Sequence, residues 1–338
     1  MIERLSDRLD EHLATAQGRR VSLRSLREAL NIAPGSKDDT NLRGLMLHRV
    51  TKKIVKPSGL DDGVYKVVRQ VKPVQVFGRE RREPIQLLFP KDFDTKMEMS
   101  FAQDIVLRGG DLILLSGISN YGKTALCINF CGENINANPV LMGNEYTTID
   151  GEPTPRFLNR LDNMDWVEWE NGGKDKFTLL PVREDYAENI VRDRINIIDW
   201  INLDASSLFG ISAVSEGIKR ELGDEGIGII AIQKAEGSPA GRGGQFTKDF
   251  ADVELLIDKF GRNEVLLTIG KVKEYTKPVT GRTFAYGIAK GVRIINFREV
   301  VKCHGCWGKG YLKSGGQCAD CIGRGFVDKT EFGDEGFV

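Results

Sequence analysis

The sequence predicts an α/β protein in which a parallel sheet is preceded by a small helical unit and followed by a cysteine-rich module. Short apolar runs alternate with helical patterns between residues 85 and 300, as in sheets whose strands are joined by crossover helices. Residues 1–70 hold three helical patterns and two strand-like runs, and residues 301–327 hold two close cysteine pairs. A polar linker with two prolines over residues 71–84 and an acidic tail over residues 328–338 complete the predicted organisation.

The composition is that of an ordinary globular protein. The 338 residues are 41% hydrophobic and 28% charged, which suits two or three domains with a sizeable core. The sequence has no apolar run of membrane-spanning length, and its first residues are too charged for a signal peptide. Six cysteines, four of them in a metal-type pattern, fit a reducing compartment. We therefore expect a cytoplasmic location and no membrane partner.

The net charge of zero hides an uneven distribution along the chain. Residues 1–82 carry 18 Lys and Arg against 10 Asp and Glu, whereas residues 83–299 carry 25 against 33. A basic unit joined to an acidic body indicates that the basic unit meets a polyanion. A solvated basic surface is the alternative.

The first unit begins with a helical pattern over residues 2–17, which ends at Gly18. Ser22 caps a second, short helix, and a third helix is predicted from about residue 39 to residue 50. Two strand-like runs follow, at 53–56 and 64–68.

Three helices followed by a hairpin resemble a winged helix-turn-helix domain. The resemblance implies that the third helix enters a groove of duplex DNA while nearby basic residues hold phosphates. The candidate DNA contacts are Arg43, Arg49 and Lys52. Such domains also bind proteins or brace a neighbouring domain, and that alternative stays open.

A phosphate-binding loop is the most specific motif in the chain. Residues 117–124 read GISNYGKT and stand between an apolar run at 111–116 and the start of a helix at Ala125. Backbone N–H groups of such a loop, and the positive end of the helix, point at phosphates. We expect Lys123 to reach the β- and γ-phosphates of ATP and the Thr124 hydroxyl to ligate Mg²⁺. The predicted nucleotide contacts are Gly117, Ile118, Ser119, Asn120, Tyr121, Gly122, Lys123 and Thr124.

Three further apolar runs end in polar residues suited to ATP hydrolysis. Glu145 follows the run at 139–142, Asp199 ends the run at 194–199, and Gln233 ends the run at 226–232. Since open parallel sheets bind ligands at the carboxyl ends of their strands, all three should gather around the triphosphate. Asp199 suits a magnesium-holding carboxylate, Glu145 a base that orients the attacking water, and Gln233 a sensor of the γ-phosphate.

With these motifs, residues 85–300 resemble the RecA-like ATPase core, in particular the hexameric replicative helicases. The resemblance implies an ATP-hydrolysing motor that acts on single-stranded DNA as a homo-oligomer. Lys271 and Lys273 match the Lys-x-Arg that reaches a neighbouring subunit's ATP in that family, although lysine replaces the usual arginine. Arg282 or Arg293 could substitute. Residues 235–248 match a channel loop, in which Arg242 and Lys248 would contact single-stranded DNA; a plain surface loop is the alternative.

Two cysteine pairs predict a zinc site. Cys303, Cys306, Cys318 and Cys321 form a C-x2-C-x11-C-x2-C pattern, and each pair continues as C-x-G-x-G. This doublet resembles the zinc module of DnaJ chaperones, which implies zinc binding only. A redox pair is the alternative. The acidic tail is a candidate dock for a replication partner, and disorder without a function is the alternative.

Two other functions remain open at this point. The core could belong to a recombination or strand-annealing ATPase that forms filaments on DNA. It could also be a nucleotide-controlled switch that sets the DNA affinity of the first unit.

Overall fold

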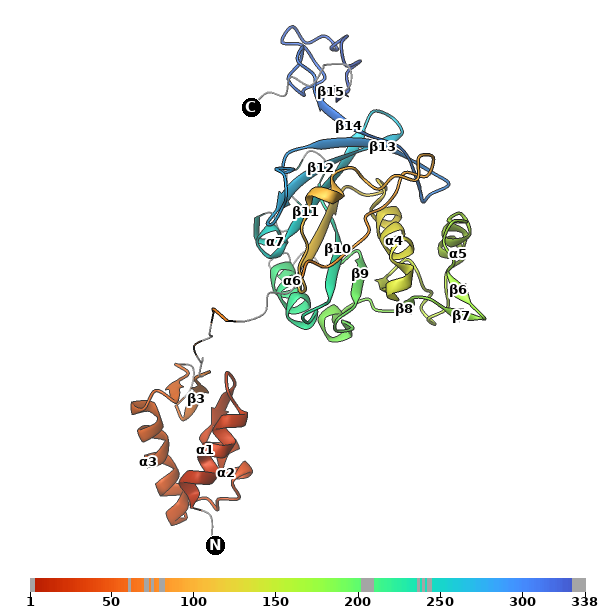
Figure 1. The fold of residues 1–338 in the computed structure, drawn as a ribbon. Coiled ribbons are helices and arrows are strands. Elements are labelled where there is room, and N and C mark those ends of the chain that lie inside the picture. The colour runs from red at the N-terminus through yellow and green to blue at the C-terminus, as the bar shows by residue number, and fades with distance from the viewer. Residues whose placement is uncertain are drawn as a thin grey trace. The chain divides into compact units, whose positions relative to one another are not determined.

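A computed structural model describes residues 4–59, 62–69, 73, 76–78, 83–201, 210–235, 238, 241 and 245–329. The chain forms two compact units, Met1–Arg81 and Arg82–Val338 (Figure 1). The division falls inside the segment expected to be a linker.

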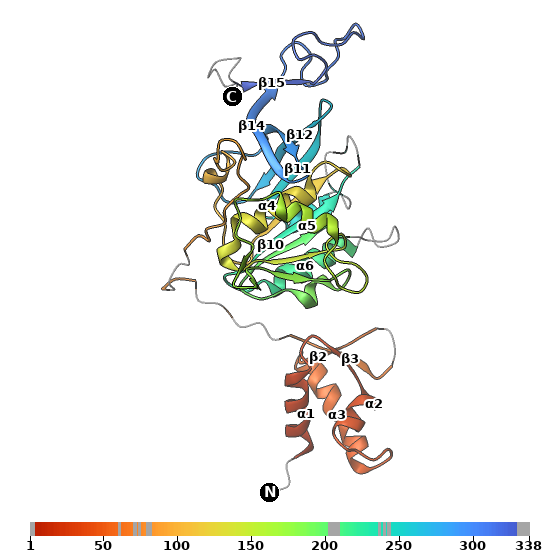
Figure 2. The same ribbon diagram turned by 90° about the vertical axis from the view of Figure 1, so that its right-hand side faces the viewer.

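The first unit combines three helices with a small antiparallel sheet (Figure 2). The side chain of Ser22 accepts the Ser25 N–H at the start of α2, and Ser36 caps α3 in the same way. Leucines from α1, α2 and α3, such as Leu9, Leu26 and Leu42, meet in its core. Its elements are α1 (Leu5–Thr15), β1 (Arg20–Ser22), α2 (Leu23–Ala29), α3 (Lys37–Thr51), β2 (Val55–Pro57) and β3 (Val64–Val67).

The strand β1 was not predicted. It spans three residues, too few for an alternating pattern to stand out, and it exists because its backbone pairs with β3. The sheet order is β1-β3-β2.

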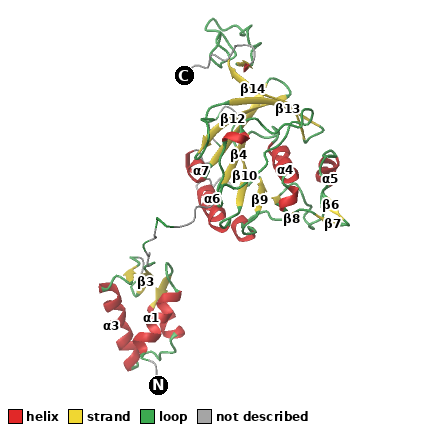
Figure 3. Cartoon of the chain, viewed as in Figure 1, coloured by secondary structure: helices red, strands yellow, loops and turns green. Residues whose placement is uncertain are grey.

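In the described residues, the second unit is built on one mixed sheet of ten strands (Figure 3). The order is β15-β14-β13-β12-β11-β4-β10-β9-β5-β8. The strands from β8 to β11 in this order run parallel, as the sequence predicts. These are β4 (Leu112–Gly117), β5 (Val140–Gly143), β8 (Thr178–Leu180), β9 (Ile195–Asp199), β10 (Ile227–Gln233) and β11 (Val253–Phe260).

The remaining strands of the sheet are antiparallel. The turn from β11 to β12 has only three residues, 261–263, which is too short for the crossover that parallel strands need. A prediction of a purely parallel sheet is therefore wrong for this part. The antiparallel strands are β12 (Glu264–Val272), β13 (Thr283–Ala289), β14 (Arg293–Lys302) and β15 (Phe326–Asp328).

Helices cover both faces of the parallel strands, which explains their unbroken apolar runs. Ile197 and Ile229 contribute to the core that includes α4 (Lys123–Glu133), while their neighbours Ile198 and Ile230 belong to the core that includes α6 (Gly210–Glu221). The other elements are α5 (Pro155–Asp162), α7 (Gln245–Phe250), the hairpin β6 (Glu170–Asn171) and β7 (Lys174–Asp175), and the 3₁₀ turns η1 (Ala102–Asp104), η2 (Ile135–Ala137) and η3 (Tyr186–Asn189).

Between β14 and β15 the chain forms a cysteine-lined module without regular strands of its own. Pairing of β15 with β14 attaches both ends of this module to the sheet. Among the described residues, no helix has the length and apolar composition needed to cross a membrane.

Candidate functional site

The loop that links β4 to α4 adopts a conformation that only particular residues tolerate. Gly122 has a φ of +89° and Asn120 a φ of +64°. A Cβ atom on Gly122 would lie 2.3 Å from Ile288 Cδ1, so a side chain there would be displaced by the core. The loop thus delivers the chain directly into the N-terminus of α4, whose first N–H groups have no partner within the helix. This arrangement favours an anion.

Lys123 is folded back into this loop. Its ammonium donates hydrogen bonds to the carbonyls of Gly117 and Ile118, at 3.0 and 2.8 Å, and the residue is 8% exposed. Burial lowers the pKa of Lys123, while the nearby Asp199 opposes the shift. A cation held by two neutral carbonyls gains by exchanging them for anionic oxygens.

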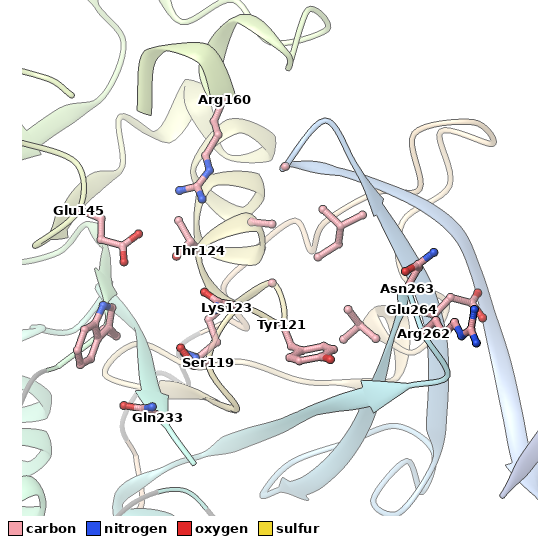
Figure 4. A pocket seen from close by; sticks show the side chains of 17 residues that line it. Ser119, Tyr121, Lys123, Thr124, Glu145, Arg160, Gln233, Arg262, Asn263 and Glu264 are labelled. Carbon is pink, nitrogen blue, oxygen red and sulfur yellow. The ribbon is translucent and has the colours of Figure 1, made fainter. Parts of the chain in front are cut away.

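A pocket of about 700 Å³ opens above this loop (Figure 4). Glu145 and Gln233 lie on one side of it, and the β11–β12 turn with Arg262 and Asn263 lies on the other. The structure therefore brings together three of the four strand ends singled out from the sequence. The lining residues that the sequence did not indicate are Ala125, Arg160, Trp200, Arg262, Asn263, Glu264, Val265, Ile288 and Gly291.

Asp199 lies buried at the end of β9, directly before the pocket-lining Trp200, with 1% of its surface exposed. The Tyr146 hydroxyl donates to its Oδ2 at 2.9 Å, whereas Oδ1 has no partner of ordinary hydrogen-bond geometry among the described residues. Burial raises the pKa of Asp199, and the hydroxyls of Thr124 and Tyr146 oppose the shift. A buried carboxylate oxygen without a donor beside a threonine hydroxyl fits a hard cation such as Mg²⁺.

Tyr146 is a site residue that sequence reasoning missed. It is fully buried, and burial together with the charge of Asp199 raises the pKa of its hydroxyl, which therefore remains a donor. Its position directly after Glu145 was the available signal.

Lys271 and Lys273 lie far from the pocket. Lys271 is the penultimate residue of β12, and Lys273 follows the end of that strand. Because β12 runs antiparallel to β11, both stand at the amino ends of β11 and β4, whereas the loop follows the carboxyl end of β4. Lys273 forms an ion pair with Asp252 at 2.6 Å, and Lys271 donates to the Lys248 carbonyl at 2.6 Å. Both lysines therefore have partners within their own subunit, outside the residues of the nucleotide motifs.

The two arginines considered as substitutes are engaged as well. Arg282 pairs with Glu299 at 2.8 Å. Arg293 pairs with Asp165 at 3.1 Å and stacks on Phe93, with 4.2 Å to the ring centre. Neither lines the pocket.

Of the predicted single-strand contacts, Lys248 is partly committed to the fold and Arg242 lies outside the described residues. The Lys248 ammonium lies 3.4 Å from Glu254, a fully buried carboxylate, and donates to the Gly270 carbonyl at 3.1 Å. Lys248 remains 39% exposed in its side chain.

Arg49 does not face solvent as expected of a DNA contact. Its guanidinium pairs with both oxygens of Asp10 at 2.7 Å, and the residue is 6% exposed. Arg49 follows Leu42 and Met46 at helical spacing, on the buried face of α3, so it braces α3 against α1. Arg43 and Lys52 are exposed.

The four cysteines of the C-terminal module converge on one point. All four sulfurs lie within 4.8 Å of one another, with 3.8 Å between Cys303 and Cys318 and 3.6 Å between Cys306 and Cys321. Ligands about 2.3 Å from a tetrahedral zinc are separated by roughly 3.8 Å, so the spacing suits that ion. The cluster can therefore hold a metal such as zinc.

The glycines after each pair explain the repeated C-x-x-C-x-G-x-G. The Gly310 N–H donates to Cys306 Sγ and the Gly325 N–H to Cys321 Sγ, each at 3.2 Å. These amides stabilise negative charge on sulfur. Although burial opposes it, the Gly310 hydrogen bond and the neighbouring thiols lower the pKa of Cys306 to about 7.

No protein-family model matches the chain, and no curated protein sequence is significantly similar to it.

Proposed function

We propose that this protein is a P-loop ATPase with a RecA-like core that works as an oligomeric, DNA-dependent motor on single-stranded DNA. The observation that carries the proposal is one pocket in which the loop with Lys123 faces Glu145 and Gln233, beside the buried Asp199. Each residue type matches a separate need of phosphoryl transfer to water. Fold alone would not support this, since many functions share similar sheets.

The residues would act on ATP in the following way. The triphosphate lies over the N-terminus of α4, where Lys123 exchanges the carbonyls of Gly117 and Ile118 for phosphate oxygens. Glu145 accepts a proton from the attacking water and orients it. Gln233, at the end of β10, senses whether the γ-phosphate is present. Mg²⁺, held through Thr124 and Asp199, would neutralise charge on the phosphates when bound.

For the first unit we propose a winged helix-turn-helix that contacts duplex DNA. Its two strands β2 and β3 follow three helices, and Arg43 and Lys52 offer exposed positive charge on and after α3. Arg49 is not included, because its charge is used by Asp10.

Assembly is part of the proposal. Lys271 and Lys273 cannot serve their own subunit's pocket from the far end of the sheet. An oligomer in which that end meets a neighbour's pocket would give them a role. Lys273→Ala subunits mixed with wild type should then lower turnover more than dilution does. If turnover falls only in proportion to the fraction of Lys273→Ala subunits, Lys273 has no role in a neighbour's pocket and serves only as the ion-pair partner of Asp252.

The deciding experiment measures ATP turnover with and without single-stranded DNA. Lys123→Ala should abolish turnover, and Glu145→Gln should retain ATP binding but lower the rate by about 10²- to 10⁴-fold. Glu152→Gln changes an exposed acid outside the pocket and is the control. Turnover that does not depend on DNA would refute the motor proposal and favour a nucleotide-controlled switch that sets the DNA affinity of the first unit. Strand displacement and microscopy then separate a ring-shaped helicase from a filament-forming recombinase.

A further inference from the structure

The cysteine module displays large apolar side chains in solvent. Trp307, Tyr311, Leu312 and Ile322 are 77%, 62%, 41% and 69% exposed, and they make up four of the eleven exposed large hydrophobic residues in the described part of the chain. The interior of the module is occupied by sulfur and Val327. The apolar residues are therefore not needed to fill it.

The contacts between the two Gly-x-Gly segments show how these residues are arranged. A Cβ on Gly310 would lie 2.4 Å from the Gly323 carbonyl, and one on Gly325 would lie 2.5 Å from the Gly308 carbonyl. The segments 308–310 and 323–325 therefore run side by side in opposite directions. This register sets Lys309 opposite Arg324 and Tyr311 opposite Ile322.

Two of the exposed residues occupy backbone conformations that favour glycine. Trp307 has a φ of +54° and Ile322 a φ of +50°, values at which a bulky or β-branched side chain is strained. They hold equivalent places in the two knuckles, directly after Cys306 and Cys321. Glycine would adopt both backbone conformations with less strain, so the large side chains at these positions cost stability.

Positive charge alternates with the aromatic residues. Residues 307–313 read WGKGYLK, and Lys309 and Lys313 are exposed and form no ion pair with any described residue. Lys302 adds a third positive charge to this surface, because its side chain lies 3.4 Å from a Cβ built on Gly308. Of the two acids in 301–328, Asp328 is paired with Arg298 at 2.8 Å, and Asp320 lies beside the cysteine cluster, with Oδ2 4.0 Å from Cys318 Sγ. The surface beside Trp307 and Tyr311 is thus basic.

We propose that this surface, made of Trp307, Lys309, Tyr311 and Lys313, binds single-stranded DNA. Bases stack on the exposed rings, and the lysines between them hold the phosphates, which is how sequence-tolerant single-strand binding is achieved. A duplex cannot use the rings, because its bases are already stacked on one another. The choice of DNA rests on the proposed function, but binding here needs neither ATP nor the pocket above α4.

The test uses the full chain and fluorescein-labelled (dT)₁₂, with anisotropy measured without nucleotide. Trp307→Ala and Tyr311→Ala should each weaken binding about tenfold, whereas Trp307→Phe, which keeps a stacking ring, should bind within about twofold of wild type. Lys309→Ala with Lys313→Ala should reduce the slope of log affinity against log salt by about 1.4. Unchanged affinity in the Trp307→Ala/Tyr311→Ala double variant overturns the proposal.

Trp307→Gly separates recognition from folding. Because its φ suits glycine, this variant should keep its zinc against a chelator as well as wild type or better, and still lose affinity for (dT)₁₂. Loss of zinc from Trp307→Gly would mean that the ring is structural, and the proposal would fail. Tyr275→Ala, which removes another exposed ring of the same unit, should leave affinity unchanged.

Duplex DNA and RNA are tested as further ligands, and ATP turnover is measured beside them. A 12-base-pair duplex should bind with no dependence on Trp307, and (rU)₁₂ binding as tightly as (dT)₁₂ would overturn the assignment to DNA. Basal ATP turnover should be the same in all these variants. If turnover is absent from wild type while Trp307 still governs (dT)₁₂ affinity, the motor proposal fails and this surface stands.

Discussion

Tyr146→Phe tests whether the buried pair at the end of β9 shapes the site. The substitution removes one oxygen and leaves the ring in its place, since Tyr146 is fully buried against Phe157. Asp199 then loses the one hydrogen-bond donor that the described residues offer to Oδ2, while Oδ1 has no partner of ordinary hydrogen-bond geometry among them. A hydrogen bond to a charged group contributes about 1.5–3 kcal/mol.

We expect the free energy of unfolding of the second unit to fall by about 2 kcal/mol. For a domain of this size that lowers the melting temperature by roughly 4–8 °C. The pKa of Asp199 should rise further, because one of the two hydroxyls that favour its charged form is gone. If Asp199 holds Mg²⁺, the Mg²⁺ concentration for half-maximal ATP turnover should rise about 10-fold or more.

Tyr186→Phe is the matched control. Tyr186 is also buried, and its hydroxyl donates at 2.9 Å to a neutral acceptor, the Arg183 carbonyl. Its loss should cost only about 1 kcal/mol and leave the Mg²⁺ requirement unchanged. Calorimetry and turnover across a Mg²⁺ series measure both effects. Equal melting temperatures and equal Mg²⁺ curves for the two variants would refute the reasoning.

Three other predictions concern the rest of the chain. Burial raises the pKa of Asp111 to about 6, above its unfolded value, so its favourable contribution to stability is present at low pH and is lost as pH rises through 6. The free energy of unfolding of Asp111→Asn relative to wild type should therefore rise by about 1–3 kcal/mol between pH 4 and pH 7, measured by thermal unfolding. Parallel curves of stability against pH for the two proteins would contradict this. Elemental analysis should find one zinc per chain, and Cys303→Ser with Cys318→Ser should remove it and raise hydrogen exchange across residues 301–327, while basal turnover survives in part. Arg49→Ala should destabilise the first unit by about 1–3 kcal/mol, whereas Arg43→Ala should change stability by less than about 0.5 kcal/mol and weaken duplex DNA binding. Equal losses of stability in the two variants would contradict the different roles given to these arginines.

The two motifs whose residues are close in sequence could be found without a structure. The loop at 117–124 is local, because a strand, a glycine turn and a helix N-terminus follow one another directly. The cysteine spacing is nearly as local, and the sulfurs do converge. Apolar runs likewise predicted the parallel strands, because strands buried on both faces must be apolar throughout.

Helical spacing also contained information that charge alone hid. Arg49 continues the stripe of Leu42 and Met46, which places it on the buried face of α3. Its charge suggested a contact with DNA at the surface, but Asp10, 39 residues away, supplies its partner. Only the packing of α1 on α3 decided between the two.

Contacts between distant segments were decided by the tertiary structure alone. Strand order sets β10 between β4 and β9, and this brings Gln233 and Glu145 to one pocket. Arg160 and Arg262 come to the same pocket from a helix and a hairpin turn whose sequences carry no motif. The reversal of β12 carries Lys271 and Lys273 to the other end of the sheet. Local residues determine which elements form, whereas the pairing and packing of elements far apart in the chain determine which side chains meet.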